Sequence, residues 1–182
     1  MKNEQLWAPW RLAYVKGIDK PPAELAPLEL APLELPPGAD PQCFICRAVA
    51  DSRDRENLVA GRGRRVVTIL NRYPYNNGHL LVAPSAHKGR LDELDDDEQR
   101  EIMETVTRTV GLLSELLNAE GFNVGLNLGR VAGAGLPGHL HWHVVPRWSG
   151  DTNFMPVLSG VDVISQSLDA LWEMLADKLS RS

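Results

Sequence analysis

Short apolar runs along the chain define four candidate strands. They cover residues 64–70, 79–84, 122–129 and 139–145. Each run is short and rich in β-branched or other apolar residues, and turn-forming residues separate the runs, as in "NRYPYNNGH" between the first two. This pattern is typical of strands joined by tight turns.

A longer helical period lies between the second and third strands. Apolar side chains recur there at three- and four-residue spacing, at Ile102, Val106, Val110, Leu113 and Leu117. Asp95 followed by Glu98 predicts a capping box at the start, and Gly121 predicts the end. An amphipathic pattern predicts a last helix over 162–179, and a short helix is expected in 43–52. Paired strands with segregated helices indicate an α+β fold with an antiparallel sheet and two main helices.

The N-terminal quarter has a different composition. Residues 1–20 contain two tryptophans, and we expect them to form an arm that packs on the main body. Residues 21–42 repeat the unit ELAPL with a proline about every fifth residue, which excludes a long helix or a central strand. We interpret them as a low-complexity insertion, and 43–182 as the single functional domain.

Overall composition excludes several classes of function. The formal net charge of -5 over 182 residues leaves no general basic surface for a nucleic acid polymer. A small anionic substrate stays open, because a pocket can be locally positive. No run of 18 apolar residues exists, so no membrane span is expected. The first residues lack a continuous apolar core typical of a signal peptide, which predicts a cytoplasmic protein.

The candidate chemistry is concentrated in two short motifs. "HLHWHVV" holds His139, His141 and His143, which share one face if this segment is a strand, opposite an apolar face. A merely solvent-facing polar strand explains three histidines in register poorly. Either the row binds a metal, or one histidine is a nucleophile that its neighbours orient. "CFIC" places Cys43 and Cys46 in a CxxC motif, which in a reducing compartment indicates metal binding or redox chemistry.

The motif "HLHWHVV" resembles the signature of the histidine-triad (HIT) family of nucleotide hydrolases and transferases. "NRYPYNNGHLLVAPSAH" and "GLNLGRVAGAG" are similar to that family's upstream blocks. "LWAPWR" and "VVPRWSGDTNF" resemble the branch of bacterial diadenosine tetraphosphate phosphorylases and related hydrolases. The resemblance implies a HIT-like fold in a homodimer whose sheets join side by side, with a tetramer as a further option in this branch.

The resemblance also implies catalytic roles. His141 would attack the α-phosphorus of a nucleotide, and a nucleotidyl-histidine would then be released by water or phosphate. His143 would contact the phosphoryl or bridging oxygens, and His79 would support the nucleophile through hydrogen bonds. The substrate implied is a nucleotide phosphoanhydride, best matched by diadenosine tetraphosphate.

Nucleotide contacts are implied at further positions. Asn71 would bind the ribose, Asn127 the phosphates or the ribose, and Trp148 could stack on a base. Backbone N–H groups of "GRVAGAG" would bind phosphate oxygens. Gly135 stands where many family members have Gln or Ser, so phosphorolysis and hydrolysis both stay open.

The family further implies a structural Zn²⁺ held by Cys43, Cys46, His87 and His139, two thiolates and two imidazoles that suit tetrahedral zinc. Mg²⁺ could accompany the polyphosphate without a dedicated protein site. Three alternatives stay open. They are hydrolysis of a nucleoside phosphoramidate, a metal-dependent hydrolase with the histidine row as ligands, and a nucleotide-binding module without turnover.

Overall fold

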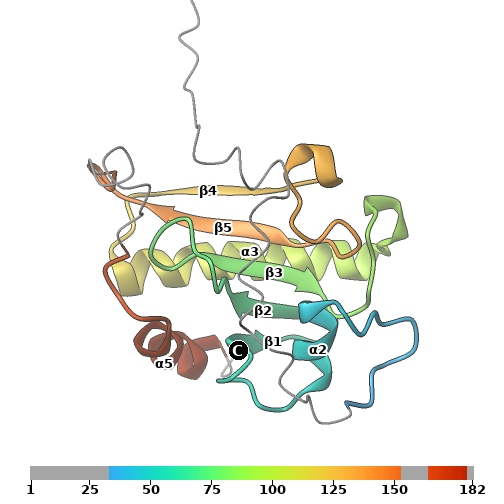
Figure 1. The fold of residues 1–182 in the computed structure, drawn as a ribbon. Coiled ribbons are helices and arrows are strands. Elements are labelled where there is room, and N and C mark those ends of the chain that lie inside the picture. The colour runs from blue at the N-terminus through green and yellow to red at the C-terminus, as the bar shows by residue number, and fades with distance from the viewer. Residues whose placement is uncertain (1–32, 153–163, 180–182) are drawn as a thin grey trace, which may run out of the picture. The chain divides into compact units, whose positions relative to one another are not determined.

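The computed structural model describes residues 33–152 and 164–179, and its centre is one antiparallel sheet (Figure 1). The sheet has five strands in the order β1-β2-β3-β5-β4, and every neighbouring pair is antiparallel. The strands are β1 (Val59–Arg62), β2 (Val66–Leu70), β3 (Leu80–Pro84), β4 (Gly121–Leu126) and β5 (Trp142–Arg147). The predicted α+β class with an antiparallel sheet is confirmed.

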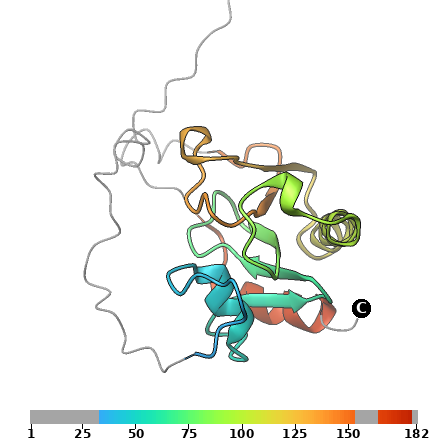
Figure 2. The same ribbon diagram turned by 90° about the vertical axis from the view of Figure 1, so that its right-hand side faces the viewer.

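Three helices pack around this sheet. The long helix α3 (Asp96–Leu117) lies on one side of it and the short helix α2 (Phe44–Ala50) on the other (Figure 2). The third helix, α5 (Leu168–Leu179), packs against β1. Central strands β2 and β3 are buried at every position, so both of their faces contribute to the core. Two single 3-10 turns, η2 (Leu91–Glu93) and η3 (Arg130–Ala132), complete the elements.

The predicted start of α3 is confirmed, whereas its predicted end is wrong. Asp95 accepts a hydrogen bond from the Glu98 backbone, and the Glu98 side chain accepts one from the Asp95 backbone, which is the expected capping box. The helix stops at Leu117, because Asn118 adopts a left-handed conformation with φ 50° and ψ 42°. Gly121 is instead the first residue of β4.

Strand β1 was not predicted, because its sequence VAGR has neither a long apolar run nor an alternating pattern. It pairs with β2 through an irregular register between Val59 and Gly61. A Cβ on Gly61 would lie 3.0 Å from Leu179 Cβ, so glycine lets α5 approach the strand closely. The contact between β1 and α5 joins residues far apart in the sequence, so the pattern of neighbouring residues could not predict this edge of the sheet.

The C-terminal helix begins later than predicted. Residues 164–167 are not helical, and α5 starts at Leu168, where the Ser167 hydroxyl accepts a hydrogen bond from the Ala170 backbone. The expected arm 1–20, residues 21–32 of the expected insertion and the first two residues of the expected helix lie outside the described residues. Within the described part, no helix is both long and apolar enough to cross a membrane.

Candidate active site and metal-ligand cluster

The histidine row enters the sheet later than predicted. Strand β5 begins at Trp142, so His139 and His141 precede it. Leu140 is held there by a hydrogen bond from its N–H to the Lys88 carbonyl at 2.7 Å, outside the β3 ladder. Leu140 is nevertheless buried in the core, and His139 and His141 are buried as well.

His141 is fixed in one tautomer by the backbone. Its Nδ1 lies 2.8 Å from the carbonyl oxygen of His139. A carbonyl can only accept, so Nδ1 carries the ring proton and Nε2 keeps a lone pair. The side chain is 7% exposed, which limits competing contacts with water. In this tautomer the lone pair on Nε2 is the one that could act as a nucleophile.

His79 and His143 form a second hydrogen-bonded unit. The Tyr75 backbone N–H donates to His79 Nδ1 at 3.0 Å, and the Asn71 amide donates to the same nitrogen at 3.2 Å. His79 Nε2 must then carry the proton, which it donates to His143 Nδ1 at 2.9 Å. His143 in turn keeps its proton on Nε2, a buried atom with no hydrogen-bond partner among the described residues. This N–H is a donor available to a bound molecule.

Burial keeps this unit neutral. Desolvation, together with smaller effects of the adjacent His143 and His141, lowers the pKa of His79 to about 3. Desolvation followed by the effect of His141 lowers the pKa of His143 to about 4. The ring centroids of His141 and His143 lie 5.1 Å apart, so the neutral donor stands beside the His141 ring. At pH 7 the neutral forms required by the hydrogen-bond pattern are also the favoured ones.

A separate cluster of potential metal ligands lies under the start of the row. Its members are Cys43, Cys46, His87 and His139, whose ligand atoms all lie within 4.8 Å of one another. Cys43 caps helix α2, and the Cys46 backbone N–H donates to its sulfur at 3.4 Å. Both cysteines are fully buried and neither forms a disulfide. The CxxC motif thus supplies two thiols to a closed group.

The donor geometry fits a small tetrahedral ion. Cys43 Sγ and His139 Nδ1 are 3.3 Å apart, and Cys46 Sγ lies 3.2 Å from His87 Nδ1 and 3.6 Å from His139 Nδ1. Sulfur and nitrogen ligands on one tetrahedral zinc ion are separated by about 3.5 Å. His139 Nε2 donates to the Pro84 carbonyl at 2.8 Å, so its Nδ1 lone pair faces the sulfurs.

The protonation state of the cysteines bears on how a metal would bind. Desolvation raises the pKa of the Cys43 thiol to about 12, so an ion bound there would have to displace the thiol proton. Where the loop that carries His87 passes His139, a Cβ on Gly89 would lie 3.2 Å from the Gly138 carbonyl oxygen. A glycine at 89 therefore allows the close approach of the two segments that carry imidazole ligands.

The row does not form a ligand set of its own. Only His139 of the three belongs to the metal-ligand cluster found among the described residues. His141 and His143 belong to no group of three or more potential ligands in the described part of the chain. This geometry argues against a catalytic metal on the row. The described cluster contains no carboxylate, so it offers no support for a Mg²⁺ site either.

The residues expected to bind the nucleotide do not all lie near the histidine row. Asn71 reaches His79, and its side-chain oxygen also accepts from the Tyr73 backbone. Asn127 is half-buried directly after β4, and Gly135 is exposed in the loop that leads to the row. Trp148 directly follows the far end of β5, and that end lies about 17 Å from the start of the strand at roughly 3.3 Å per residue. Its indole N–H donates to the Leu117 and Asn118 carbonyls, so within this chain it caps α3 rather than joining the row.

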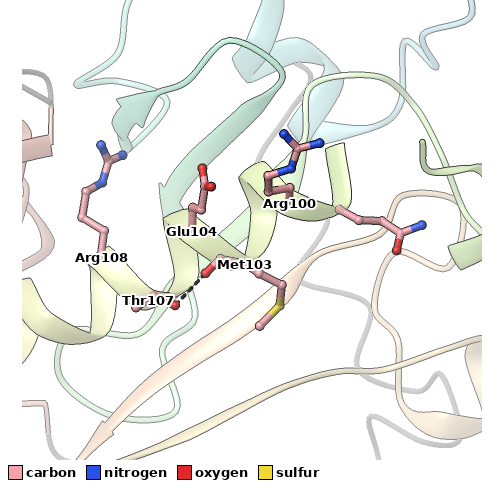
Figure 3. Close-up of a pocket in the computed structure, with 6 residues that line it drawn as sticks. Arg100, Met103, Glu104, Thr107 and Arg108 are labelled. Atoms are coloured by element: carbon pink, nitrogen blue, oxygen red, sulfur yellow. Dashed lines mark hydrogen bonds between the residues drawn. The ribbon is translucent and has the colours of Figure 1, made fainter. Parts of the chain in front are cut away.

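The outer face of α3 carries a hollow of about 650 Å³, which is unrelated to the histidines (Figure 3). Arg100, Met103, Glu104, Thr107 and Arg108 project around it from successive turns of the helix. The Thr107 hydroxyl donates back to the Met103 carbonyl at 2.8 Å. This face is open to solvent and holds no cysteine or histidine, so it offers a place for control substitutions.

Three contributors to the site were missed from the sequence. The Pro84 and Lys88 carbonyls anchor the row, and the Tyr75 ring lies over the His79 and His143 rings with centroids 4.7 and 5.7 Å away. Backbone carbonyls have no residue-type signal, so no pattern could have revealed them. Tyr75 stands in a turn four residues before His79, and only the fold brings it against both rings.

The family of this chain follows from comparison with known proteins. The HIT domain family model matches residues 53–150, which include the row, His79 and His87. An AP-4-A phosphorylase from Mycobacterium tuberculosis is 39% identical over 178 residues, 98% of this chain and 85% of its own length. The chain therefore belongs to the HIT family. The cysteines of the metal-ligand cluster precede the region that the family model matches.

Solved structures agree on the fold. A Zn-bound histidine triad family protein from Mycobacterium smegmatis superposes with a TM-score of 0.60 at 23% identity, covering 76% of this chain and 93% of its own. A Plasmodium falciparum diadenosine triphosphate hydrolase gives 0.55 at 21% identity, covering 72% and 76%. At these identities the likeness establishes the histidine-triad fold, and function must be argued from the site.

The hydrogen-bond pattern predicts the tautomer of each ring in the row. Nitrogen-15 NMR of histidine-labelled protein at pH 7 should show His141 protonated on Nδ1, and His79 and His143 protonated on Nε2. The rare Nδ1–H form at His141 is the informative one, because free neutral histidine prefers Nε2–H. Protonation of His141 on Nε2 would contradict the geometry.

Proposed function

We propose that this chain is a nucleotide-processing enzyme that cleaves a phosphoanhydride of diadenosine tetraphosphate through a nucleotidyl intermediate on His141. The observation that carries the proposal is the hydrogen bond from His141 Nδ1 to the His139 carbonyl, since it leaves the Nε2 lone pair free. The 39% identity to an AP-4-A phosphorylase over nearly the whole chain supports the choice of substrate.

The proposed reaction proceeds in two displacements. His141 Nε2 attacks the α-phosphorus, a P–N bond forms, the P–O bond to the next phosphate breaks, and ATP leaves with the bonding electrons. An oxygen of inorganic phosphate then attacks the same phosphorus and breaks the P–N bond, which yields ADP. With water as acceptor the second product is AMP. Two displacements at one phosphorus allow the same hydrogen-bond donors to stabilise both transition states.

His143 is the donor that this scheme requires. Its Nε2–H is buried beside His141 and is not used by another described residue. A desolvated donor of this kind is stronger than one in water, because water does not compete for the hydrogen bond. In the proposal it donates to the phosphoryl or bridging oxygen, and His79 holds its orientation through the bond at 2.9 Å.

Nucleotide binding outside the row stays a proposal. Asn71 would act on the ribose while it orients His79, and Asn127 and the backbone around Gly135 would contact the phosphates. Gly135 offers no side-chain donor to the acceptor, and the similarity to an AP-4-A phosphorylase is what favours phosphorolysis over hydrolysis. Trp148 would contact a base only where a second copy of the chain supplies it, because the two ends of β5 are far apart.

Product analysis tests this function. We expect diadenosine tetraphosphate to give ATP and ADP in the presence of phosphate, and little product without it. Formation of ATP and AMP without phosphate would assign water as the acceptor. Two ADP without phosphate would contradict attack at the α-phosphorus. If the dinucleotide is not cleaved in either tube, a nucleoside phosphoramidate is the next substrate to test, and the proposed substrate is wrong.

The role of His141 is tested by substitution. His141→Asn should lower kcat by at least roughly a thousandfold, because it removes the attacking nitrogen. Its nucleotide affinity, measured by calorimetry, should stay within a few fold. Met103→Ala on the outer face of α3 is the matched control, since Met103 is 53% exposed and remote from the row. Turnover of His141→Asn at the control rate would remove His141 as the nucleophile.

We further propose that the metal-ligand cluster binds a structural Zn²⁺. The support is the buried Cys2His2 donor set and the separations of 3.2, 3.3 and 3.6 Å between three of its sulfur–nitrogen pairs. The M. smegmatis neighbour is described as Zn-bound, and it shares this fold. A closed set of four protein ligands leaves no position for substrate, so the ion would stabilise the structure rather than the reaction.

Metal analysis and thermal unfolding test the zinc proposal together. We expect about one zinc per chain, and we expect Cys46→Ser to lose the metal and lower the midpoint of unfolding by several degrees or more, because binding energy is folding energy. Ser85→Ala, on the segment after β3 but outside the ligand set, is the control. A metal-free wild-type protein that unfolds at the same temperature with and without added zinc would contradict the proposal.

We also propose a homodimer and a cytoplasmic location. Strand β4 ends the sheet and pairs only with β5 among the described residues, and its Val124 is 45% exposed. A second copy that pairs along this edge would form the expected homodimer. The two free thiols in a metal-ligand arrangement suit a reducing compartment, which is consistent with the cytoplasm.

A further inference from the structure

The turn before β3 carries a tyrosine, Tyr75, that is exposed to solvent although its ring contacts two histidines of the site. Tyr75 is 54% exposed, yet its ring lies against both members of the buried His79–His143 pair. Its centroid is 4.7 Å from the His79 ring at a 34° interplanar angle and 5.7 Å from the His143 ring at 23°. One face of the phenol thus covers the pair.

The backbone of the same residue reaches the pair from a second direction. The Tyr75 N–H donates to His79 Nδ1 at 3.0 Å, which sets the direction of the hydrogen bond from His79 to His143. The turn is itself anchored beyond Tyr75, because the Asn76 amide donates to the Asp151 carboxylate at 2.8 Å and to the Pro146 carbonyl at 3.2 Å. The ring is therefore held over the pair by its own backbone.

We propose that Tyr75 is a positioning residue of the proposed reaction, whose ring covers the His79–His143 pair and excludes water from it, so that the His143 Nε2–H stays oriented and neutral beside His141. The catalytic part of this inference rests on the function proposed above. The structural part does not, since it concerns only the hydration and order of the pair.

The physical reason is the cost of solvating the pair. Removing the aromatic ring would admit water over His79 and His143, and water stabilises the charged imidazolium. In the described part of the chain, the ionisable groups that face the pair are the two rings themselves, His141 on the segment before β5 and the Tyr75 phenol. None of these is a carboxylate, so removal of the ring changes mainly the hydration of the pair.

The experiment compares three variants by NMR titration of the histidines. We expect Tyr75→Ala to raise the titration midpoints of His79 and His143 by at least about one pH unit toward the unperturbed value of roughly 6.5, whereas Tyr75→Phe leaves them unchanged. Tyr73→Ala is the matched control, since Tyr73 is a neighbouring tyrosine of the same turn and is 66% exposed. Tyr75→Leu, which keeps a smaller apolar cover over the pair, should raise both midpoints by less than Tyr75→Ala, and it is measured instead if the alanine variant does not fold.

Kinetics supply the second readout. Tyr75→Ala should lower kcat about tenfold with KM changed less than about twofold, because the His143 donor becomes less well oriented and is exposed to competing water while substrate contacts stay. Unchanged midpoints in Tyr75→Ala would overturn the inference. A raised KM with unchanged kcat would also overturn it and make Tyr75 a substrate contact. If the wild-type protein does not cleave the dinucleotide, the proposed function fails, while the midpoints still decide the role of Tyr75.

Discussion

The histidine at the start of the row connects the two halves of the site. The side chain of His139 lies between the cysteine sulfurs and the Pro84 carbonyl, and its own carbonyl holds the proton of His141. One residue therefore belongs to the metal-ligand cluster through its ring and to the reactive row through its backbone. Any shift of the His139 backbone would change the direction in which the His141 lone pair points.

The three histidines of the row differ in the groups that fix their rings. Each of the side chains at 139, 141 and 143 is fixed by a different partner. The His139 carbonyl on His141 Nδ1 leaves the Nε2 lone pair free, and the Pro84 carbonyl on His139 Nε2 leaves the Nδ1 lone pair toward the cysteine sulfurs. His143 accepts from a histidine on Nδ1, so it presents a donor. Hydrogen-bond partners, rather than residue type, thus assign the chemistry.

The sequence predicted much of this architecture because its strongest signals are local. The capping box of Asp95 and Glu98, the apolar runs of the central strands and the HxHxH spacing all depend on neighbouring residues. Resemblance to the HIT family then grouped Cys43 with His139, which lie 96 positions apart. Neither periodicity nor composition alone could have paired them.

What the sequence did not predict depends on long-range contacts. Strand β1 forms because α5 packs on it, and β5 starts at Trp142 because Leu140 pairs with Lys88 instead of β3. Trp148 was expected near a base, but its indole N–H lies on the carbonyls that end α3. Tyr75 has no motif of its own, and its contact with two buried rings exists only in the folded turn.

The central claim is that phosphorus is displaced twice, first by His141 and then by the acceptor. The most direct measurement is the stereochemical course at the α-phosphorus, followed with a dinucleotide made chiral there by sulfur and oxygen isotope substitution. Each in-line displacement inverts the configuration, so the account predicts overall retention. Overall inversion would show a single direct attack by phosphate or water, and it would contradict a nucleotidyl intermediate on this row.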